Sequence, residues 1–417
     1  MRHMGLLLTI VLAALPFRLY AQSPWTISST GLKYVSSVKA VNASVAFVAG
    51  TSGIMKTTDG GSTWVSAGGT AVDTIYWNTI ETVGPDTVFA TATIGTGDVI
   101  FRTVNGGANW APVASQPNGF FNGVRMFDRL NGFAVSDPVA GAWVVLLTSD
   151  GGASWHPTAS PPLRIGTEAG YSNSAAIAGQ TFAWFGTGNH RIYHSTDGGV
   201  HWDSISTVND DCYAIWFADP AHGIMGTGNG IAYSTDAGAT WSAVSLGMEV
   251  YGVTWTISSG FWAAGGKTVT RSADGGVTWK TSLSTSFYIQ HLSFTEDGGS
   301  LYGLAGGDSG KVAMYNGLLD SAPDSKAGRP TDYRLFQNFP NPFNPKTVIS
   351  CQWPGVSDVR LVVYDILGRE VAVLVNEKKA PGSYEVEFDA RGLSSGIYFY
   401  RLTAGKFVET RKMILLR

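Results

Sequence analysis

Three carboxylate residues in the first two-thirds of the sequence have the chemistry that glycoside hydrolysis requires. Glu168, Asp211 and Glu249 lie in three successive polar segments, and a tyrosine follows closely after each of them. Hydrolysis of a glycosidic bond uses two carboxyl groups about 5 to 10 Å apart. Asp211 can reach this separation from Glu168 or Glu249 if the segments lie in adjacent structural units. A solvated acidic rim or a weak cation site explains the same residues. A non-enzymatic role is therefore favoured, with a glycoside hydrolase as the alternative.

A second set of candidates consists of aromatic residues that recur where strands are predicted to begin. They lie in the segments GLKYV, TIYWN, GFFNG, AGYSN, DDCYA, EVYGV and SFYIQ. Exposed aromatic rings stack on sugars and anchor peptides, because they offer large contact areas at low entropic cost. If the segments open at one mouth, these residues form a ligand-binding ring; otherwise they plug a channel or pack between sheets. The candidates are Tyr34, Tyr76, Trp77, Phe121, Tyr171, Tyr213, Tyr251 and Tyr288.

Other kinds of chemistry find little support. His190 and His194 have the spacing of a helical zinc motif, but they lie in a predicted strand, where four residues span about 13 Å. No phosphate-binding loop or serine-nucleophile motif is present. Residues 22–332 contain 14 Lys or Arg against 23 Asp or Glu, a net charge of −9 that is unsuited to nucleic acid. The sequence therefore predicts no cofactor, no metal site and no nucleic-acid partner.

The elements that position these candidates are marked by a phrase that occurs six times. We call each copy the repeat turn; the copies read TTDGGSTW, TVNGGANW, TSDGGASW, STDGGVHW, STDAGATW and SADGGVTW. They are 38 to 47 residues apart, a period that suits units of four short strands. The acidic residue can accept bonds from backbone N–H groups, glycine allows a tight turn, and tryptophan can bury its ring between sheets. The phrase is thus predicted to be structural, through Asp59, Trp64, Asn105, Trp110, Asp150, Trp155, Asp197, Trp202, Asp236, Trp241, Asp274 and Trp279.

The six copies resemble the Asp-box (BNR) repeats of β-propellers, with the greatest likeness to sortilin-like and photosystem II assembly-factor-like propellers. The resemblance implies an all-β, seven-bladed propeller over residues 22–319, in which the N-terminal strand PWTISST completes the last blade. It places the repeat turns away from the functional face. It also suggests an envelope assembly or scaffolding factor as a third possible function.

Both ends of the sequence indicate export. Residues 1–21 have a basic start, an apolar core too short to span a membrane and a small residue at the end, as in a secretory signal peptide. No later segment is apolar enough for a membrane span. The two cysteines, Cys212 and Cys351, are expected in different modules, so no disulfide is predicted.

The C-terminal part has a different character. A polar linker at 320–332 precedes residues 333–417, where alternating apolar runs predict a small immunoglobulin-like β-sandwich. This part has 12 Lys or Arg against 8 Asp or Glu, a net charge of +4. It resembles the C-terminal sorting domain of type IX secretion, on the segments NFPNPFNPKTVI, VYDILGREV and GIYFYRL with KMILLR at the end. The motif residues are Asn338, Pro340, Asn341, Pro342, Phe343, Asn344, Pro345, Tyr364, Asp365, Gly368, Gly396 and Tyr398.

This resemblance implies export across the outer membrane of a Bacteroidota-type bacterium by the type IX machinery, often with removal of the tail. Cleavage is expected in the linker. The sequence as a whole predicts a monomeric, secreted or surface-displayed propeller that binds a glycan or a protein.

Overall fold

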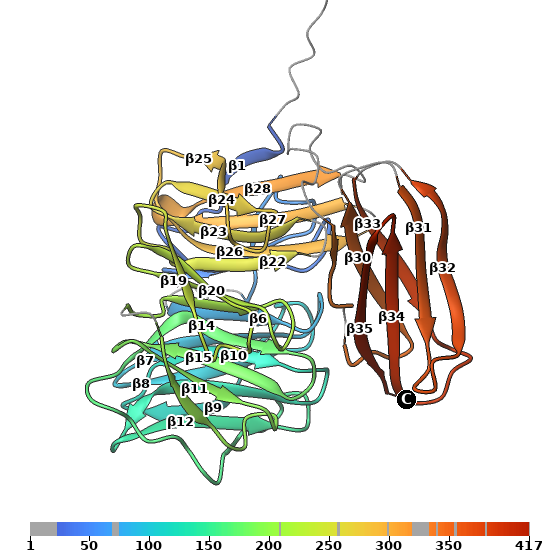
Figure 1. The fold of residues 1–417 in the computed structure, drawn as a ribbon. Coiled ribbons are helices and arrows are strands. Elements are labelled where there is room, and N and C mark those ends of the chain that lie inside the picture. Colours follow the sequence, from blue (N-terminus) through green and yellow to red (C-terminus); the bar gives the residue numbers. More distant parts are fainter. Residues whose placement is uncertain are drawn as a thin grey trace, which may run out of the picture.

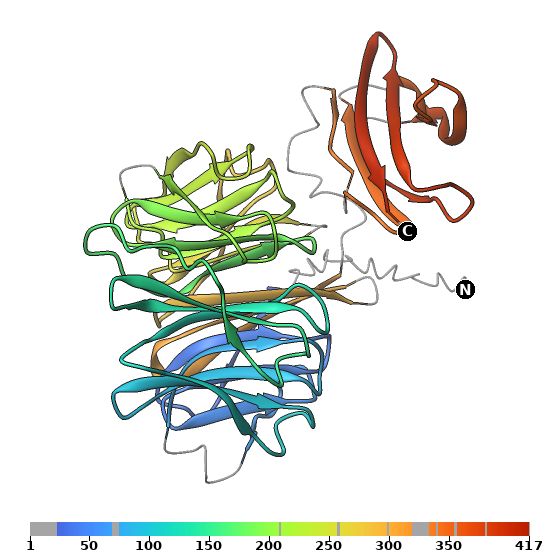
Figure 2. The same cartoon turned by 90° about the horizontal axis from the view of Figure 1, so that it is seen from below.

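The structure is a computed structural model that describes residues 23–416, apart from 69–74, 208–209, 257–258, 298–299, 319–332, 339–340, 354–356 and 380–381. The predicted signal peptide and linker lie outside the described residues. Within the described residues, the regular structure is almost entirely β-strand, with one short 3-10 segment at Asp308–Gly310. The chain forms two bodies, a propeller and a C-terminal β domain (Figures 1 and 2). The all-β prediction is therefore confirmed.

The described strands of the propeller form antiparallel units of four. The first three units are β2 (Val35–Ala40), β3 (Ala46–Gly50), β4 (Gly53–Thr57) and β5 (Val65–Ser66); β6 (Tyr76–Thr82), β7 (Val88–Ile94), β8 (Gly97–Thr103) and β9 (Ala111–Pro117); and β10 (Phe121–Met126), β11 (Gly132–Val139), β12 (Ala142–Thr148) and β13 (His156–Pro157). The next two are β14 (Gly170–Ala178), β15 (Phe182–Thr187), β16 (Arg191–Ser195) and β17 (Asp203–Ser206); and β18 (Ala214–Phe217), β19 (Gly223–Thr227), β20 (Gly230–Ser234) and β21 (Ser242–Ser245), joined by one parallel bridge between Asn173 and Ala214. The last two are β22 (Gly252–Thr256), β23 (Gly260–Gly265), β24 (Thr268–Ser272) and β25 (Lys280–Ser284); and β26 (Ile289–Asp297), β27 (Ser300–Gly307) and β28 (Lys311–Leu318) with β1 (Trp25–Ser29).

The units close into a ring. The first strand of each unit contacts the first strand of the next, and β26 of the last unit contacts β2 of the first. The last unit takes its fourth strand from the N-terminal side of the chain, since β1 pairs with β28 with Trp25 opposite Tyr315 (Figure 1). This pairing covers an edge that would otherwise be open. In the described part of the chain, the first strands of the units thus surround a central channel.

The repeat turns act as local anchors at one end of the ring. In the first copy, Asp59 accepts bonds from the Thr63 backbone N–H (2.9 Å) and hydroxyl (2.6 Å), and Thr57 accepts from the Gly61 N–H (2.8 Å). The bonds from Thr63, together with one from the Thr57 hydroxyl, lower the pKa of Asp59 to about 2. Gly61 has φ 87°, a conformation that favours glycine.

Bonds between loops show which end of the ring the turns occupy. Gly60 N–H donates to Ser44 (2.9 Å) and Gly151 N–H to Leu130 (2.8 Å), in the hairpins between the first and second strands of their units. The segments that lead into the first strands bond instead to the hairpins between second and third strands, as Thr51 N–H does to Tyr34 (3.2 Å). The repeat turns and the aromatic segments therefore lie at opposite ends of the propeller.

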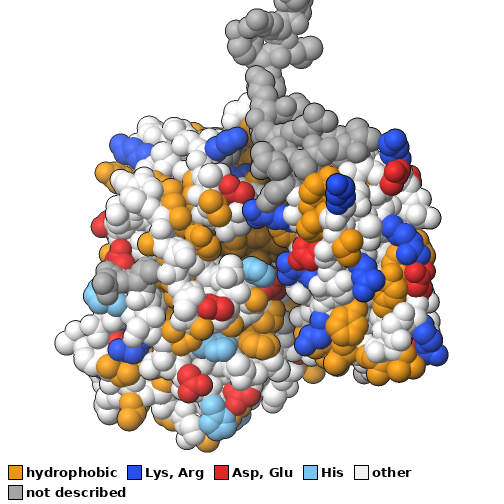
Figure 3. Space-filling model, in the orientation of Figure 1, with side chains coloured by type: hydrophobic (Ala, Val, Ile, Leu, Met, Phe, Trp, Pro, Cys, Tyr) orange, Lys and Arg blue, Asp and Glu red, His pale blue; other side chains and the backbone are white. Residues whose placement is uncertain are grey.

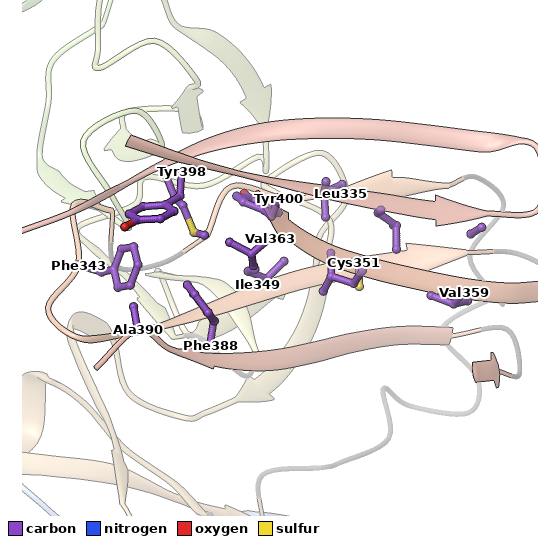
Figure 4. Packing of buried hydrophobic residues seen from close by; sticks show 14 of the residues in the cluster. Leu335, Phe343, Ile349, Cys351, Val359, Val363, Phe388, Ala390, Tyr398 and Tyr400 are labelled. Atoms are coloured by element: carbon purple, nitrogen blue, oxygen red, sulfur yellow. The ribbon is translucent and has the colours of Figure 1, made fainter. Parts of the chain in front are cut away.

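The C-terminal domain consists of two packed sheets. One contains β29 (Arg334–Leu335), β30 (Lys346–Trp353) and β33 (Gly382–Asp389); the other contains β31 (Ser357–Tyr364), β32 (Glu370–Lys379), β34 (Gly396–Ala404) and β35 (Phe407–Leu415). Buried side chains from both sheets, among them Ile349, Val363, Phe388 and Tyr400, meet between them (Figure 4). Lys and Arg side chains are frequent on the visible face of this domain, in line with its positive sequence charge (Figure 3).

Candidate functional site

One end of the channel opens into a cavity surrounded by aromatic side chains. We call it the tyrosine mouth; its volume is about 230 Å³. Six aromatic side chains line it, each from the residue just before or at the start of a first strand. They are Tyr34, Tyr76, Phe120, Tyr171, Tyr213 and Tyr251.

The residues that follow Tyr76 and Phe120 point the other way, because side chains alternate along a strand. Trp77 and Phe121 occupy this second position, and both are fully buried. Trp77 packs against Phe101 with ring centroids 5.2 Å apart, while Phe121 lies in the cluster that contains Phe89. The prediction that Trp77 and Phe121 line a ligand-binding ring is therefore wrong. In GFFNG it is the first phenylalanine, Phe120, that lines the mouth.

Three tyrosines form a continuous aromatic wall on one side of the mouth. The ring of Tyr213 stacks on that of Tyr251, with centroids 4.9 Å apart and an interplanar angle of 9°. Tyr171 meets the other side of Tyr213 edge to face, at 4.8 Å. The three side chains come from three successive units, so the wall is held by the rigid frame of the ring.

Hydrogen bonds fix the tyrosine hydroxyl groups. Tyr171 donates to Asp211 Oδ2 (2.9 Å), Tyr251 donates to Glu249 Oε2 (2.7 Å), and Tyr34 donates to Gln290 Oε1. Burial, aided by these carboxylates, raises the pKa of Tyr171 and Tyr251 above the ordinary value. Burial raises the pKa of Tyr34 to about 12. All three are neutral phenols near neutral pH, and each hydroxyl oxygen keeps a lone pair for a ligand donor.

Tyr76 and Tyr288 are the most accessible aromatic residues at this end. Tyr76 lines the cavity and is 47% exposed. Tyr288 is 54% exposed, lies outside the cavity lining, and has Lys267 Nζ 5.3 Å from its ring centroid. Of the two, Tyr76 is therefore the one placed to contact a ligand in the cavity.

The inner part of the mouth is lined by polar side chains that the sequence analysis missed. Asn173 Nδ2 donates to Nδ1 of His291 (2.7 Å) and to the Tyr251 carbonyl (3.0 Å). Burial lowers the pKa of His291 to about 4, so its ring is neutral and carries its proton on Nε2. A signal was available in the sequence. Counted from Tyr34, Tyr76, Phe120, Tyr171, Tyr213, Tyr251 and Tyr288, the position two residues later is polar in five of the seven segments: Ser36, Asn78, Asn122, Asn173 and Gln290.

The three carboxylates proposed for catalysis do not converge on the mouth. Glu168 is buried and accepts bonds from the Tyr193 hydroxyl (2.8 Å) and Trp143 Nε1 (3.2 Å). Its Oε1 lies 2.9 Å from Arg191 Nε, so the carboxylate is part of a buried ion pair. Asp211 and Glu249 each bind a tyrosine hydroxyl, and no Asp or Glu is among the described residues that line the cavity. The arrangement holds tyrosines in place, and no pair of carboxylates from the described residues lines the cavity.

The described residues contain no group of three or more His, Cys, Asp or Glu placed to hold a metal ion. His194 stacks against Trp184 with ring centroids 5.0 Å apart, whereas His190 lies in the preceding turn with φ 60°. The two histidines therefore lie in different local environments.

The motif residues of the C-terminal domain hold its last strand. Asn341 Oδ1 accepts from Ile414 N–H (2.8 Å), Phe343 N–H donates to the Ile414 carbonyl (2.9 Å), and Leu416 N–H donates to the Phe343 carbonyl (3.0 Å). We call these contacts the C-terminal clasp. Phe343 is buried among the core residues, whereas Pro342 and Asn344 are exposed and Pro340 lies outside the described residues.

The other motif residues shape turns and the core. Asp365 accepts from Leu367 N–H (2.9 Å) and Arg369 N–H (3.0 Å) in a turn where Gly368 has φ 77°. Tyr364 ends β31, Gly396 begins β34, and the Tyr398 hydroxyl donates to the Ser394 carbonyl (2.8 Å). Asn338 donates to Thr347 Oγ1 (2.9 Å), while the Pro345 carbonyl accepts from Ala390 N–H (2.8 Å).

The sequence of this domain decides what it is. Residues 337–416 match the secretion system C-terminal sorting domain. The chain thus carries the tail of type IX cargo, and the protein is sorted to the cell surface or to the outside of the cell. The predicted localisation is confirmed. Within the described residues, no helix is long and apolar enough to cross a membrane.

Solved structures show a β-propeller fold over 70% of the chain. YCF48 from Cyanidioschyzon merolae is 17% identical, with a TM-score of 0.55, and the match covers 70% of this chain and 98% of that protein. YCF48 bound to D1 peptide is 16% identical, with a TM-score of 0.55 and coverage of 70% and 96%. Virginiamycin B lyase from Staphylococcus aureus is 12% identical, with a TM-score of 0.54 and coverage of 70% and 98%. No curated protein matches the sequence at a significant level. At these identities the likeness shows a β-propeller fold alone.

Proposed function

We propose that the protein is an exported recognition module that binds a neutral extracellular glycan in the tyrosine mouth. The observation that carries this proposal is the wall of Tyr171, Tyr213 and Tyr251 beside a cavity lined by amide, hydroxyl and imidazole groups. Sugars are bound by aromatic surfaces together with donors and acceptors that read their hydroxyl groups. Both kinds of group are fixed here before any ligand arrives, which lowers the entropic cost of binding.

Charge at the mouth favours a neutral ligand over an acidic one. Asp211 and Glu249 accept bonds from the hydroxyl groups of the tyrosine wall, while Asp308 accepts from the Tyr288 N–H (2.9 Å) at the rim. None of the described residues lining the cavity is Lys or Arg. A uronic acid or sialic acid would therefore meet repulsion without a cationic partner.

A glycoside hydrolase has less support, because a retaining or inverting mechanism needs two carboxyl groups that face the scissile bond. An envelope assembly factor would use the same mouth for a protein segment, and this function is an outcome of the test below. The proposal also includes the domain boundaries, with residues 22–319 as the propeller, 320–332 as the linker and 333–417 as the sorting domain.

The test is a glycan-array screen of the full exported chain, followed by calorimetry on each hit. Tyr76→Ala and Tyr213→Ala should weaken binding at least about tenfold, as expected when an aromatic anchor is removed. Tyr302→Ala, in β27 and outside the cavity lining, is the matched control and should bind as the wild type does. Release of reducing ends from a bound glycan would show a hydrolase instead. Absence of glycan binding, with capture of a peptide that Tyr213→Ala abolishes, would replace the glycan by a protein ligand.

A further inference from the structure

The opposite end of the channel holds a second cavity with a different character. We call it the Lys39 cavity; its volume is about 230 Å³, and its charged lining residues are Lys39, Glu81 and Arg125. It shares Ser172 and Asn173 with the tyrosine mouth, so the two cavities are the two ends of one channel. We propose that the Lys39 cavity binds a small oxyanion, a carboxylate or a phosphate.

The charged groups come from three successive units and do not balance. Lys39 Nζ lies 2.9 Å from Glu81 Oε1, and Arg125 Nη1 lies 3.0 Å from Glu81 Oε2. One carboxylate therefore faces two cations, which leaves one positive charge. The three side chains are only 18%, 11% and 13% exposed, so water screens this charge poorly.

Several donors in the cavity have no acceptor in the described part of the chain. Arg125 uses Nε for the Ala175 carbonyl (2.8 Å) and Nη1 for Glu81 and the Val124 carbonyl (2.9 Å), which leaves both protons of Nη2. Lys39 Nζ contacts Glu81 alone among the described carboxylates. Its remaining two N–H groups are available.

Two serine hydroxyl groups add further donors. Ser37 Oγ accepts from Ile80 N–H (3.1 Å), and Ser293 Oγ accepts from Ala40 N–H (3.0 Å). Each hydroxyl therefore keeps its own proton to donate, and both residues line the cavity. A guanidinium edge, an ammonium group and two hydroxyl groups form a donor set suited to an oxyanion.

Burial makes the unbalanced charge costly. Desolvation lowers the pKa of Lys39 from its usual value, although Glu81 opposes this effect. A bound anion would neutralise the excess charge and accept the free N–H and O–H donors together. A cation would add to the excess positive charge, so the cavity favours anions over cations. Among the described residues, the channel thus has an aromatic end without a carboxylate in its lining and a basic end.

The experiment titrates the full exported chain with inorganic phosphate and, separately, with succinate, by calorimetry at constant ionic strength in sodium chloride. We expect saturable binding in the millimolar range by at least one of the two anions, and the stronger arm distinguishes phosphate from carboxylate. Lys39→Gln and Arg125→Gln should each weaken this binding about tenfold or more, as expected for the loss of a charge-assisted hydrogen bond. Glu81→Gln should strengthen it, because the competing carboxylate is removed. Lys280→Gln, an exposed lysine in β25, is the matched control and should leave it unchanged.

Two results would overturn the proposal. One is the absence of saturable binding of both anions by the wild-type protein. The other is binding that survives in Lys39→Gln and Arg125→Gln, which would place the anion elsewhere. Circular dichroism checks that each variant is folded. If Arg125→Gln does not fold, Arg125→Lys replaces it, because lysine keeps the positive charge but lacks the forked guanidinium group. The titrations of the wild-type protein and of Lys39→Gln then still test whether the anion binds in this cavity.

Discussion

Asn173 and His291 meet across the channel, with Asn173 Nδ2 2.7 Å from Nδ1 of His291. Asn173 belongs to β14 and His291 to β26, so the contact joins two units that are not neighbours in the ring. Burial keeps the imidazole neutral, and the contact turns its remaining N–H away from the asparagine. The tyrosine mouth therefore contains a fixed donor that does not depend on a charge.

The buried, neutral imidazole of His291 predicts a loss of stability in acid. Burial lowers the pKa of His291 from 6.5 to about 4. As the pH falls from about 6.5 towards 4, the unfolded chain gains a proton that the native protein does not bind, so the free energy of unfolding decreases. The expected loss from this residue is about 3 kcal/mol between pH 7 and pH 4. Urea unfolding at several pH values measures it.

His222, whose pKa is shifted in the opposite direction, provides the control. Hydrogen bonding to Asp219 raises the pKa of His222, so its contribution is present in acid and is lost as the pH rises through the raised pKa. His291→Gln should reduce the acid-induced loss, whereas His222→Gln should not. An unchanged pH profile in His291→Gln would contradict the buried neutral imidazole.

Two consecutive phenylalanines should separate folding from binding. Phe121→Ala removes a fully buried ring and should lower the free energy of unfolding by about 3–5 kcal/mol. Phe120 lines the mouth and is half-buried, so Phe120→Ala should cost less stability and weaken ligand binding instead. Urea unfolding measures the loss of stability, and titration with the glycan measures the loss of binding. A larger loss of stability in Phe120→Ala would reverse the assigned orientation of this strand.

Phe120 and Phe121 also show how much of the structure can be predicted from the sequence. The repeat turns and their spacing were enough to predict the propeller, because each turn needs only residues close in sequence. The orientation of Phe120 and Phe121 could not be predicted from the sequence, because two adjacent aromatic residues fit either face of a strand. The partners of Glu168 could not be predicted either. Arg191 and Tyr193 reach it through the fold, and no local pattern marks such a pair.

The polar channel residues were missed for a related reason. Asn173 and His291 are far apart in sequence, and their contact exists only after the ring has closed. Lys39, Glu81 and Arg125 likewise come from three units. Aligning the seven segments that begin the first strands recovers the polar position, but it does not reveal which side chains meet.

The repeat turns should contribute to stability without affecting binding. Asp59→Ala removes the acceptor for the Thr63 N–H and hydroxyl, and the urea midpoint should fall. Asp59→Asn keeps one acceptor oxygen and should have a smaller effect, as the natural Asn105 indicates by accepting from Asn109 N–H (3.0 Å). Because hydrogen bonding lowers the pKa of Asp59, its contribution is present above pH 4 and is lost as the pH falls towards about 2. Weaker ligand binding by folded Asp59→Ala would contradict a purely structural role.

The C-terminal clasp should decide whether the protein is exported. Asn341 and Phe343 bond to the main chain at Ile414, so the first and last motifs of the sorting domain form one structure. Phe343→Ala removes a buried ring from the core on which β35 packs, and should destabilise the domain by about 3–5 kcal/mol. Asn341→Ala removes the acceptor of a partly buried hydrogen bond and should cost about 0.5–1.5 kcal/mol. In a host with type IX secretion, both variants should accumulate inside the cell, as measured by fractionation and immunoblotting.

Asn344→Ala supplies the matched control, because this residue is exposed and should leave export unchanged. Thermal unfolding of the purified variants separates a loss of folding from a loss of recognition. If Phe343→Ala is unstable but still reaches the surface, the machinery reads a linear signal and does not need the clasp. If Asn344→Ala blocks export while the domain stays folded, recognition depends on the exposed part of the motif, and the clasp serves only to present it.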